Sequence, residues 1–305
     1  MGARAKGDRS TKREWRSIRD LLCAAEAKAR VALIGAPLQL GSVTPGECGR
    51  APDVIRKALR RIGTYDVETE RDVETAIVDL GDLKVAKETP ATAFEAIRNA
   101  AAESVAAQDL TIILGGNNAV TRPGVAALRD LEKTGLITFD AHFDMRDTTE
   151  GLTNGNPVQA LLDDGLPGEN IFQIGIAPFA NAKYMHDEAK DAGNRIYTMR
   201  EVRKIGVRAV TRRALSKLSA RCEHIYVDFD IDVIERGLAP GAPGARPGGL
   251  RTSDFFAAAR LVGAHRKVRA VDLTEFDPSL DVSETTALVA GRWVAELLAG
   301  FETRA

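Results

Sequence analysis

Residues 224–232 have the sequence HIYVDFDID, which combines the pattern of a buried strand with three aspartates. Side chains two positions apart on a strand point to the same face, so Asp228, Asp230 and Asp232 are expected to share one. Burying one unpaired carboxylate is costly, and neighbouring like charges add to the cost. Because the interleaved apolar residues belong in a core, the pattern favours a bound multivalent cation over a solvated acidic turn.

The rest of the chain alternates between short β-branched runs and Ala-, Arg- and Leu-rich stretches with helical spacing. Eight runs predict buried strands: 30–35, 75–80, 110–115, 136–140, 170–175, 194–199, 224–230 and 268–273. Strands that alternate with helices predict an α/β fold with a mainly parallel sheet covered on both faces. A closed eightfold barrel and an open three-layer sandwich fit this count equally. We expect a single domain over 30–305, preceded by an N-terminal arm and helix over 1–29.

Asp140, His142 and Asp144 form a second cluster with the same two-residue spacing, directly after the predicted strand LITF (136–139). Together the two clusters supply five carboxylates and one imidazole. A set made mainly of oxygen donors favours Mn²⁺ over Zn²⁺. Because so many carboxylates exceed what one ion needs, the sequence predicts a pair of divalent ions that activate water.

Two other predicted strands also end in polar residues, the turn GGNN (115–118) and the pair Glu275 and Asp277. In parallel α/β folds the ligand site lies at the carboxyl ends of the strands. These residues are therefore expected beside the two aspartate clusters.

Composition excludes several other classes of function. The chain has 305 residues with a formal net charge of -1, which gives no reason to expect nucleic acid or a membrane surface as a partner. Its three cysteines form no CxxC pair, so a thiolate zinc site is not expected. No apolar run approaches the roughly 20 residues that span a bilayer, and the N-terminus lacks the apolar segment of a signal peptide. We therefore expect a cytoplasmic protein.

These motifs resemble those of the ureohydrolases, the superfamily of arginases, agmatinases and formimidoylglutamases. The resemblance extends over about residues 30–300 and keeps the order of the motifs. It rests on IGAPLQLGS (34–42), GGNN (115–118), DAHFD (140–144), DFDIDVIERGLAPGAPGARPGGL (228–250) and DLTEFDP (272–278). It implies a three-layer α/β/α sandwich with a mainly parallel eight-stranded sheet, and it favours that sandwich over the barrel.

The resemblance also implies a ligand set for two Mn²⁺ ions. Asp140 and Asp230 would bridge the ions, Asp144 would bind one of them, and His142 and Asp232 would bind the other. A hydroxide bridging the two metals would attack the central carbon of an amidine or guanidine. Members of this superfamily are usually trimers or hexamers, so we expect a homo-oligomer.

Catalytic roles follow for Glu275, Asp144 and Asn154 by the same resemblance. Glu275 aligns with the glutamate that binds the cationic nitrogens of the substrate. Asn154 and Asn156 are further candidates for substrate binding. Arg146, two residues beyond the DAHFD motif, is a candidate partner for a substrate carboxylate.

Two departures from the family pattern narrow the prediction. The usual Asp-His of the glycine turn is Asn117-Asn118, so Asn118 takes the place of a histidine metal ligand and one ion is expected to be weakly held or absent. Asn154 stands where arginases carry a histidine. Formimidoylglutamases also lack that histidine, and IGIAPFANA (174–182) looks closest to their loop. The leading hypothesis is a formimidoylglutamase-like hydrolase of small amidines or guanidines, and the alternative is a non-catalytic member that binds a metabolite or one metal ion.

Overall fold

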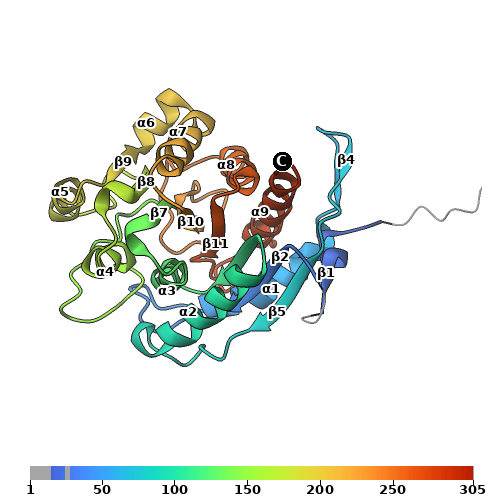
Figure 1. Ribbon diagram of the computed structural model, residues 1–305, viewed down its shortest axis with the longest axis horizontal. Coiled ribbons are helices and arrows are strands. Elements are labelled where there is room, and N and C mark those ends of the chain that lie inside the picture. Colours follow the sequence, from blue (N-terminus) through green and yellow to red (C-terminus); the bar gives the residue numbers. More distant parts are fainter. Residues whose placement is uncertain (1–14, 25–27, 305) are drawn as a thin grey trace, which may run out of the picture.

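A computed structural model describes residues 15–24 and 28–304 of the chain. Its central feature is a nine-stranded sheet in the order β1-β5-β2-β6-β11-β10-β7-β8-β9 (Figure 1). Every neighbouring pair of strands in this sheet is parallel. The strands are β1 (Leu22–Cys23), β2 (Val31–Ala36), β5 (Ile77–Asp82), β6 (Leu110–Gly115), β7 (Thr134–Phe139), β8 (Ile171–Ile176), β9 (Arg195–Thr198), β10 (His224–Asp230) and β11 (Val268–Thr274).

All eight predicted strands are present, and the α/β fold with a parallel sheet is confirmed. The ninth strand, β1, was not predicted because two residues are too short to carry a periodic pattern. Its residues pair with Ile77 and Val78 at the edge of the sheet. A separate antiparallel hairpin of β3 (Tyr65–Asp66) and β4 (Arg71–Asp72) stands apart from the main sheet (Figure 1).

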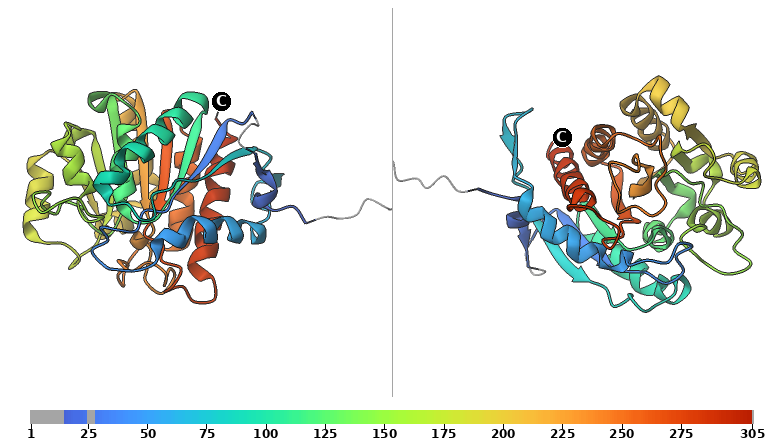
Figure 2. Two further views of the ribbon diagram at one scale, coloured as in Figure 1. Left: turned by 90° about the horizontal axis from the view of Figure 1, so that it is seen from below. Right: turned by 180° about the vertical axis from the view of Figure 1, so that it is seen from behind.

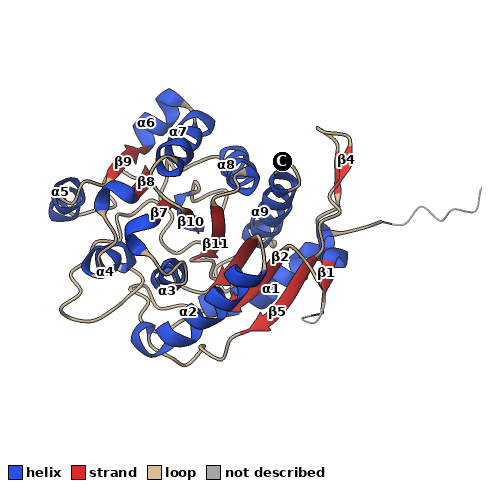
Figure 3. Cartoon of the chain, in the orientation of Figure 1, coloured by secondary structure: helices blue, strands red, loops and turns tan. Residues whose placement is uncertain are grey.

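Helices cover both faces of the sheet (Figures 2 and 3). One apolar core lies under α1, α6, α7, α8 and α9, and a second core lies under α2, α3, α4 and α5. The helices are α1 (Ala51–Ala58), α2 (Pro90–Ala107), α3 (Thr121–Ala126), α4 (Pro157–Asp163), α5 (Lys183–Asp191), α6 (Met199–Ile205), α7 (Val207–Ser219), α8 (Thr252–Ala264) and α9 (Thr285–Phe301). This is the predicted three-layer α/β/α sandwich, and the barrel is excluded because the sheet stays open.

The predicted N-terminal arm and helix lie partly outside the described residues, which omit 1–14 and 25–27. Of the described part, Ile18 and Leu21 are buried in the core of the sandwich, and the short helix η1 (Ile18–Leu21) leads directly into β1. The division of the chain at residue 30 stays a prediction. No helix within residues 15–24 and 28–304 has the length and apolarity needed to cross a membrane.

An aromatic cluster fixes the two strands that carry the aspartate motifs. Phe139 and Phe229 lie opposite each other in the pairing of β7 with β10, and their rings stack at a centroid distance of 4.7 Å. Phe255 and Trp293 pack edge-on against Phe229 from the helices behind. Buried aromatic contacts of this kind hold neighbouring backbones in a single register. The packed ends of β7 and β10 therefore hold the polar residues that follow Phe139 and Phe229 in fixed positions.

Candidate functional site

Residues that follow three neighbouring strands, β7, β10 and β11, line one cavity. The polar clusters predicted from the sequence follow β6, β7, β10 and β11, which are adjacent in the order β6-β11-β10-β7. The cavity has a volume of about 150 Å³. Its lining includes His142, Asp144, Asp230, Asp232 and Glu275. These residues, some of them more than a hundred positions apart in the sequence, lie together with Asp140 at the base of the cavity, which we call its floor.

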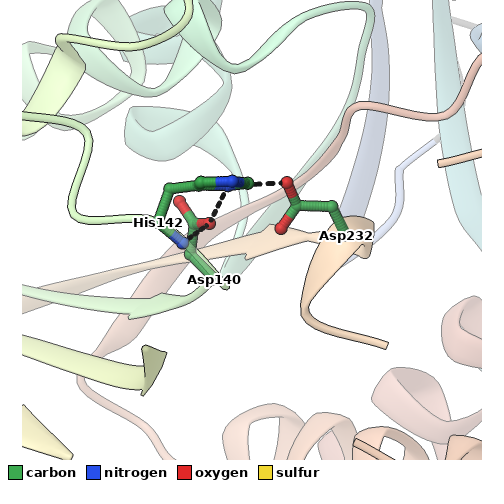
Figure 4. A group of neighbouring side chains, drawn as sticks. All are labelled: Asp140, His142 and Asp232. Atoms are coloured by element: carbon green, nitrogen blue, oxygen red, sulfur yellow. Dashed lines mark hydrogen bonds and ion pairs between the residues drawn. The ribbon is translucent and has the colours of Figure 1, made fainter. Parts of the chain in front are cut away.

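The tightest group in this floor is Asp140, His142 and Asp232, one ligand atom from each lying within 4.8 Å of the others (Figure 4). The Nδ1 atom of His142 is 2.9 Å from an oxygen of Asp232 and 3.4 Å from an oxygen of Asp140. Asp140 follows β7 directly, and Asp232 lies in the short helix η7 (Ile231–Val233) after β10. The group therefore joins two neighbouring strand ends.

The expectation that three aspartates of β10 share a face needs a correction. The strand ends at Asp230, so alternation of side chains does not extend to Asp232. The backbone turns into η7 instead, and the Asp230 carboxylate accepts a hydrogen bond of 2.8 Å from the Asp232 amide. Asp232 in turn accepts a hydrogen bond from the backbone amide of Ala141. Asp232 therefore reaches the cavity through this turn, which the two hydrogen bonds hold in place.

Burial and mutual repulsion perturb these groups strongly. Burial, and then the charges of neighbouring carboxylates, raise the pKa of Asp230 and of Asp144 well above the usual range. The same two causes raise the pKa of Asp140 to about 6. Burial alone would lower the pKa of His142, but the charges of Asp232 and Asp140 raise it to about 11.

These groups fit a divalent cation. Within residues 15–24 and 28–304, the recorded ion-pair partner of Asp140 and Asp232 is the His142 ring, and neither pairs with a lysine or arginine. A single imidazolium carries too little charge to balance several buried carboxylates, and a divalent metal ion removes that cost. Carboxylate oxygens with a single imidazole suit a hard or intermediate ion such as Mn²⁺.

Asn118 lies at the site, but its amide oxygen faces away from it. The side-chain nitrogen donates a hydrogen bond of 2.6 Å to Asp144. The side-chain oxygen accepts from the hydroxyls of Thr121 and Thr274 at 3.0 and 2.8 Å. To coordinate an ion through oxygen, the amide would have to turn over and give up both threonine contacts.

Glu275 is buried and held by two donors. Its Oε1 atom accepts hydrogen bonds from the Asn118 backbone amide at 2.7 Å and from the Asn154 side chain at 2.9 Å. Glu275 has φ 61° and Asp144 has φ 54°, a left-handed conformation that costs energy for residues other than glycine. Both residues also line the cavity, where the surrounding packing holds this conformation.

Asn154 links this glutamate to the loop over the cavity. Its side-chain oxygen accepts a hydrogen bond of 2.7 Å from the Val43 amide, while its nitrogen donates to Glu275. Both polar atoms of the side chain therefore have partners. This arrangement suits a residue that positions Glu275 and the loop that contains Val43.

Asn156 does not line the cavity. Its side-chain nitrogen donates to the carbonyls of Asp147 and Gly151, and its oxygen accepts from the Thr153 amide. These bonds shape the 147–156 loop, and a substrate contact of Asn156 stays a prediction. Arg146, in contrast, lines the cavity.

Sequence reasoning missed two cavity residues, Asn181 and Arg246. Asn181, in the loop after β8, accepts a hydrogen bond of 2.8 Å from the Phe143 amide and donates one of 3.0 Å to the Ala141 carbonyl. These two bonds fix the position of the DAHFD loop. An asparagine just after a strand is a weak signal for such contacts. Arg246 lies in the long loop after η7, where no periodic pattern indicates which way a side chain points.

A buried network extends from Asn118 below the floor. Asp228 pairs in register with Asp272 on the adjacent strand, and both are fully buried. The Tyr226 hydroxyl donates to Asp272 at 2.7 Å, and the Thr121 hydroxyl lies 2.8 Å from the same carboxylate. Burial, followed by the Asp272 charge, raises the pKa of Asp228 well above its usual range. Asp228 therefore lies buried beside this network and does not line the cavity.

Comparisons with known proteins agree with this geometry. The family model described as the Arginase family matches residues 29–300. Formimidoylglutamase from Halalkalibacterium halodurans is 33% identical over 274 residues, which cover 88% of this chain and 86% of that protein. Formimidoylglutamase from Bacillus subtilis is 31% identical over 277 residues, covering 89% of this chain and 87% of that protein.

Solved structures give the same relationship. The crystal structure of formimidoylglutamase from Bacillus subtilis has a TM-score of 0.89 at 28% identity, covering 98% of this chain and 96% of that chain. Formiminoglutamase from Trypanosoma cruzi with Mn²⁺ has a TM-score of 0.88 at 22% identity, covering 96% and 100%, and shares the fold. With a family model that spans nearly the whole chain and relatives above 30% identity over most of it, this protein belongs to the arginase family.

Proposed function

We propose that this protein is a metal-dependent hydrolase of C–N bonds in linear amidines, of the formimidoylglutamase type. The observation that carries the proposal is the buried group of Asp140, His142 and Asp232 at the strand ends of an arginase-family fold. The curated relatives of this chain include formimidoylglutamases, an agmatinase and a guanidinopropionase, all of which are enzymes. They do not favour the alternative of a non-catalytic member.

Two Mn²⁺ ions are the proposed cofactor. The residues that would hold them are Asp140, His142, Asp144, Asp230 and Asp232. Asn118 would join them only if its amide turned over and gave up its two threonine contacts. When bound, such ions act as Lewis acids and make water a strong nucleophile near neutral pH. The oxygen-rich donor set and the lack of a lysine or arginine partner for Asp140 and Asp232 support this assignment.

The residues of the chain would orient the substrate for attack. Glu275 would receive the cationic nitrogens of the amidine, because a buried carboxylate forms strong charge-assisted hydrogen bonds. Asn154 would hold Glu275 in place through its 2.9 Å hydrogen bond. Asp144 would accept the proton that water loses and pass it to the departing nitrogen. With a formimino substrate the products are formamide and an amine, and with a guanidino substrate they are urea and an amine.

The test is a substrate screen with the Mn²⁺-loaded protein. Formimino and guanidino compounds are incubated with the protein while formamide, urea and ammonia are measured. Hydrolysis of N-formimidoylglutamate above the other compounds is expected. Absence of turnover with every amidine and guanidine, in protein shown to contain Mn²⁺, would refute the proposal.

Metal binding should strengthen as pH rises. In the metal-free protein the pKa of the His142 ring is about 11 and that of Asp140 is about 6. His142 must therefore lose a proton to bind an ion at neutral pH, and below about pH 6 Asp140 must lose one as well. Protons compete with metal for these atoms. We expect the apparent Mn²⁺ affinity to rise about tenfold per pH unit between pH 6 and 8, with proton release on binding. Calorimetry in buffers of different ionisation enthalpy measures both, and a flat affinity would contradict His142 as a ligand.

Substitution of Asn118 by histidine should tighten one ion. An imidazole in place of the amide adds a stronger donor beside Asp144, at the cost of the threonine contacts of Asn118. We expect a gain of about 1–3 kcal/mol for the weaker binding step. Titration of wild type and Asn118→His with Mn²⁺ in one buffer follows both steps. A weaker step that does not change would mean that residue 118 shapes the loop without contacting metal.

A homo-oligomer, either a trimer or a hexamer, remains the expected assembly, and a cytoplasmic location also stays a prediction. Multi-angle light scattering of the full chain measures the mass directly, with 32.8 kDa expected for a single chain. A mass of three or six chains is the predicted result. A monomer at all working concentrations would exclude this assembly.

A further inference from the structure

Two arginines from distant parts of the chain line the same cavity as the carboxylates. Arg146 follows the DAHFD motif, and its backbone amide donates a hydrogen bond of 3.0 Å to the Gly155 carbonyl. A Cβ atom at Gly155 would lie 2.6 Å from Cδ of Arg146. The absence of a side chain at Gly155 therefore gives the arginine room to lie along the cavity wall.

Arg246 belongs to a loop that lies directly on the proposed metal ligands. A Cβ atom at Gly244 would come within 2.1 Å of an Asp232 oxygen and 3.2 Å of the His142 ring. The loop is braced by Arg236, whose guanidinium donates to the carbonyls of Ala242 and Pro243. Arg246 is thus held beside the cavity by close backbone packing.

Neither guanidinium has an acidic partner among the described residues. Arg146 makes no side-chain hydrogen bond there, and Arg246 donates one nitrogen to carbonyls of its own loop, at 2.6 Å from Gly244. In contrast, Arg56 pairs with Asp79, and Arg122 pairs with Asp164. A guanidinium has five N–H donors in a fork that matches a carboxylate, so both arginines keep donors for a ligand.

The charges of the cavity point to an anionic ligand group. Five carboxylates, Asp140, Asp144, Asp230, Asp232 and Glu275, surround the floor, and two divalent ions would neutralise four of their charges. The two guanidinium groups then leave the rest of the cavity positive. A substrate with an ammonium tail would meet like charge there, whereas a substrate with carboxylates would meet complementary charge.

We propose that Arg146 and Arg246 form a carboxylate-binding pair that selects amidine substrates with an anionic far end, one carboxylate for each guanidinium. This proposal rests on the proposed function and deepens it, since it names the residues that select the anionic substrate. The amidine would lie over the metal ligands and Glu275, and the carboxylates would contact the arginines.

The experiment compares three formimino substrates that contain two, one or no carboxylates. These are N-formimidoylglutamate with two, the formimino derivative of 4-aminobutyrate with one, and formamidine with none. The variants are Arg146→Gln, Arg246→Gln and the double variant, with Arg208→Gln on the exposed face of α7 as the matched control. All are assayed with Mn²⁺, and metal content is measured for each.

Each single variant is expected to raise KM for N-formimidoylglutamate by about 10- to 100-fold, the loss that follows from removing a hydrogen bond to a charged group. The effects of the two single changes should multiply in the double variant. Turnover of formamidine should stay within about twofold of wild type, as should every substrate with Arg208→Gln. An unchanged KM for N-formimidoylglutamate would overturn the proposal, and so would an equal loss for all three substrates.

A binding measurement separates this proposal from the proposed function. If wild type hydrolyses no amidine, the proposed hydrolase is refuted, and calorimetry with glutamate and with putrescine then tests the arginine pair directly. Tighter binding of glutamate than of putrescine, weakened about tenfold or more by either arginine substitution, supports the pair. Equal affinity for glutamate in wild type and both variants overturns it.

Discussion

Asp230→Asn is expected to abolish hydrolysis and to lower Mn²⁺ content. Asp230 is the proposed bridging carboxylate, and a neutral amide cannot hold two cations together. The substitution keeps the shape of the side chain, and an amide oxygen can still accept the 2.8 Å hydrogen bond from the Asp232 amide. We expect kcat/KM to fall by about three orders of magnitude or more, equivalent to ~4 kcal/mol of activation free energy.

Stability measurements distinguish loss of a ligand from loss of the fold. Burial and neighbouring charges raise the pKa of Asp230, so at neutral pH its ionised form opposes folding of the metal-free protein. Metal-free Asp230→Asn should therefore be at least as stable as metal-free wild type. Added Mn²⁺ should raise the melting temperature of wild type far more than that of the variant, because stabilisation follows metal affinity.

Asp191→Asn, an exposed aspartate in α5, is the matched control and should leave activity and metal content unchanged. Undiminished turnover of Asp230→Asn with full metal occupancy would show that Asp230 is not the bridging ligand. A lower melting temperature of the metal-free variant would instead point to a structural role.

The strands and the order of the site motifs could be predicted because they depend on local chemistry. Buried β-branched runs have no other stable environment in a chain of this length, and aspartates within them require partners. The sequence also placed GGNN and DAHFD at strand ends that do meet in the folded chain. It missed β1, because Leu22 and Cys23 are paired by the neighbouring strand and not by any pattern of their own.

Side chains on turns and loops could not be placed in this way. Alternation predicts direction along a strand, but it stops at Asp230, and Asp232 reaches the cavity through η7. Asn118 could be placed near Asp144, whereas the orientation of its amide depends on Thr121 and Thr274, one of them 156 positions away. Arg246 was missed for a related reason, since its position depends on the backbone packing of its loop against the metal ligands.

Glu275→Gln is expected to impair catalysis while leaving metal binding intact. The Glu275 Oε1 atom accepts hydrogen bonds from the Asn118 amide and the Asn154 side chain, and a glutamine oxygen can accept both. Only the charge that would face the amidine is lost. Leaving the cation of a substrate unpaired in a buried site costs about 3–4 kcal/mol, so kcat/KM should fall by about 100- to 1000-fold.

The pH profile gives a second readout of the same substitution. Burial raises the pKa of Glu275 to about 7 in the metal-free protein, against the opposing effect of its two hydrogen bonds. Bound cations would lower this pKa again. Because the ionised form is the one that binds an amidine, wild-type kcat/KM should fall as pH decreases through this pKa, at or below about pH 7. With Mn²⁺ kept saturating at every pH, Glu275→Gln should lack that acidic limb.

Glu284→Gln is a close control for Glu275→Gln. Glu284 lies in the same loop after β11 and has a similar left-handed backbone, with φ 57° against 61°, but it is exposed and pairs with Arg61. Its substitution should change neither kcat/KM nor the pH profile. If Glu275→Gln retained kcat/KM within twofold, Glu275 would not bind the substrate. If it lost Mn²⁺ in proportion to activity, Glu275 would instead belong to the metal ligands or their support.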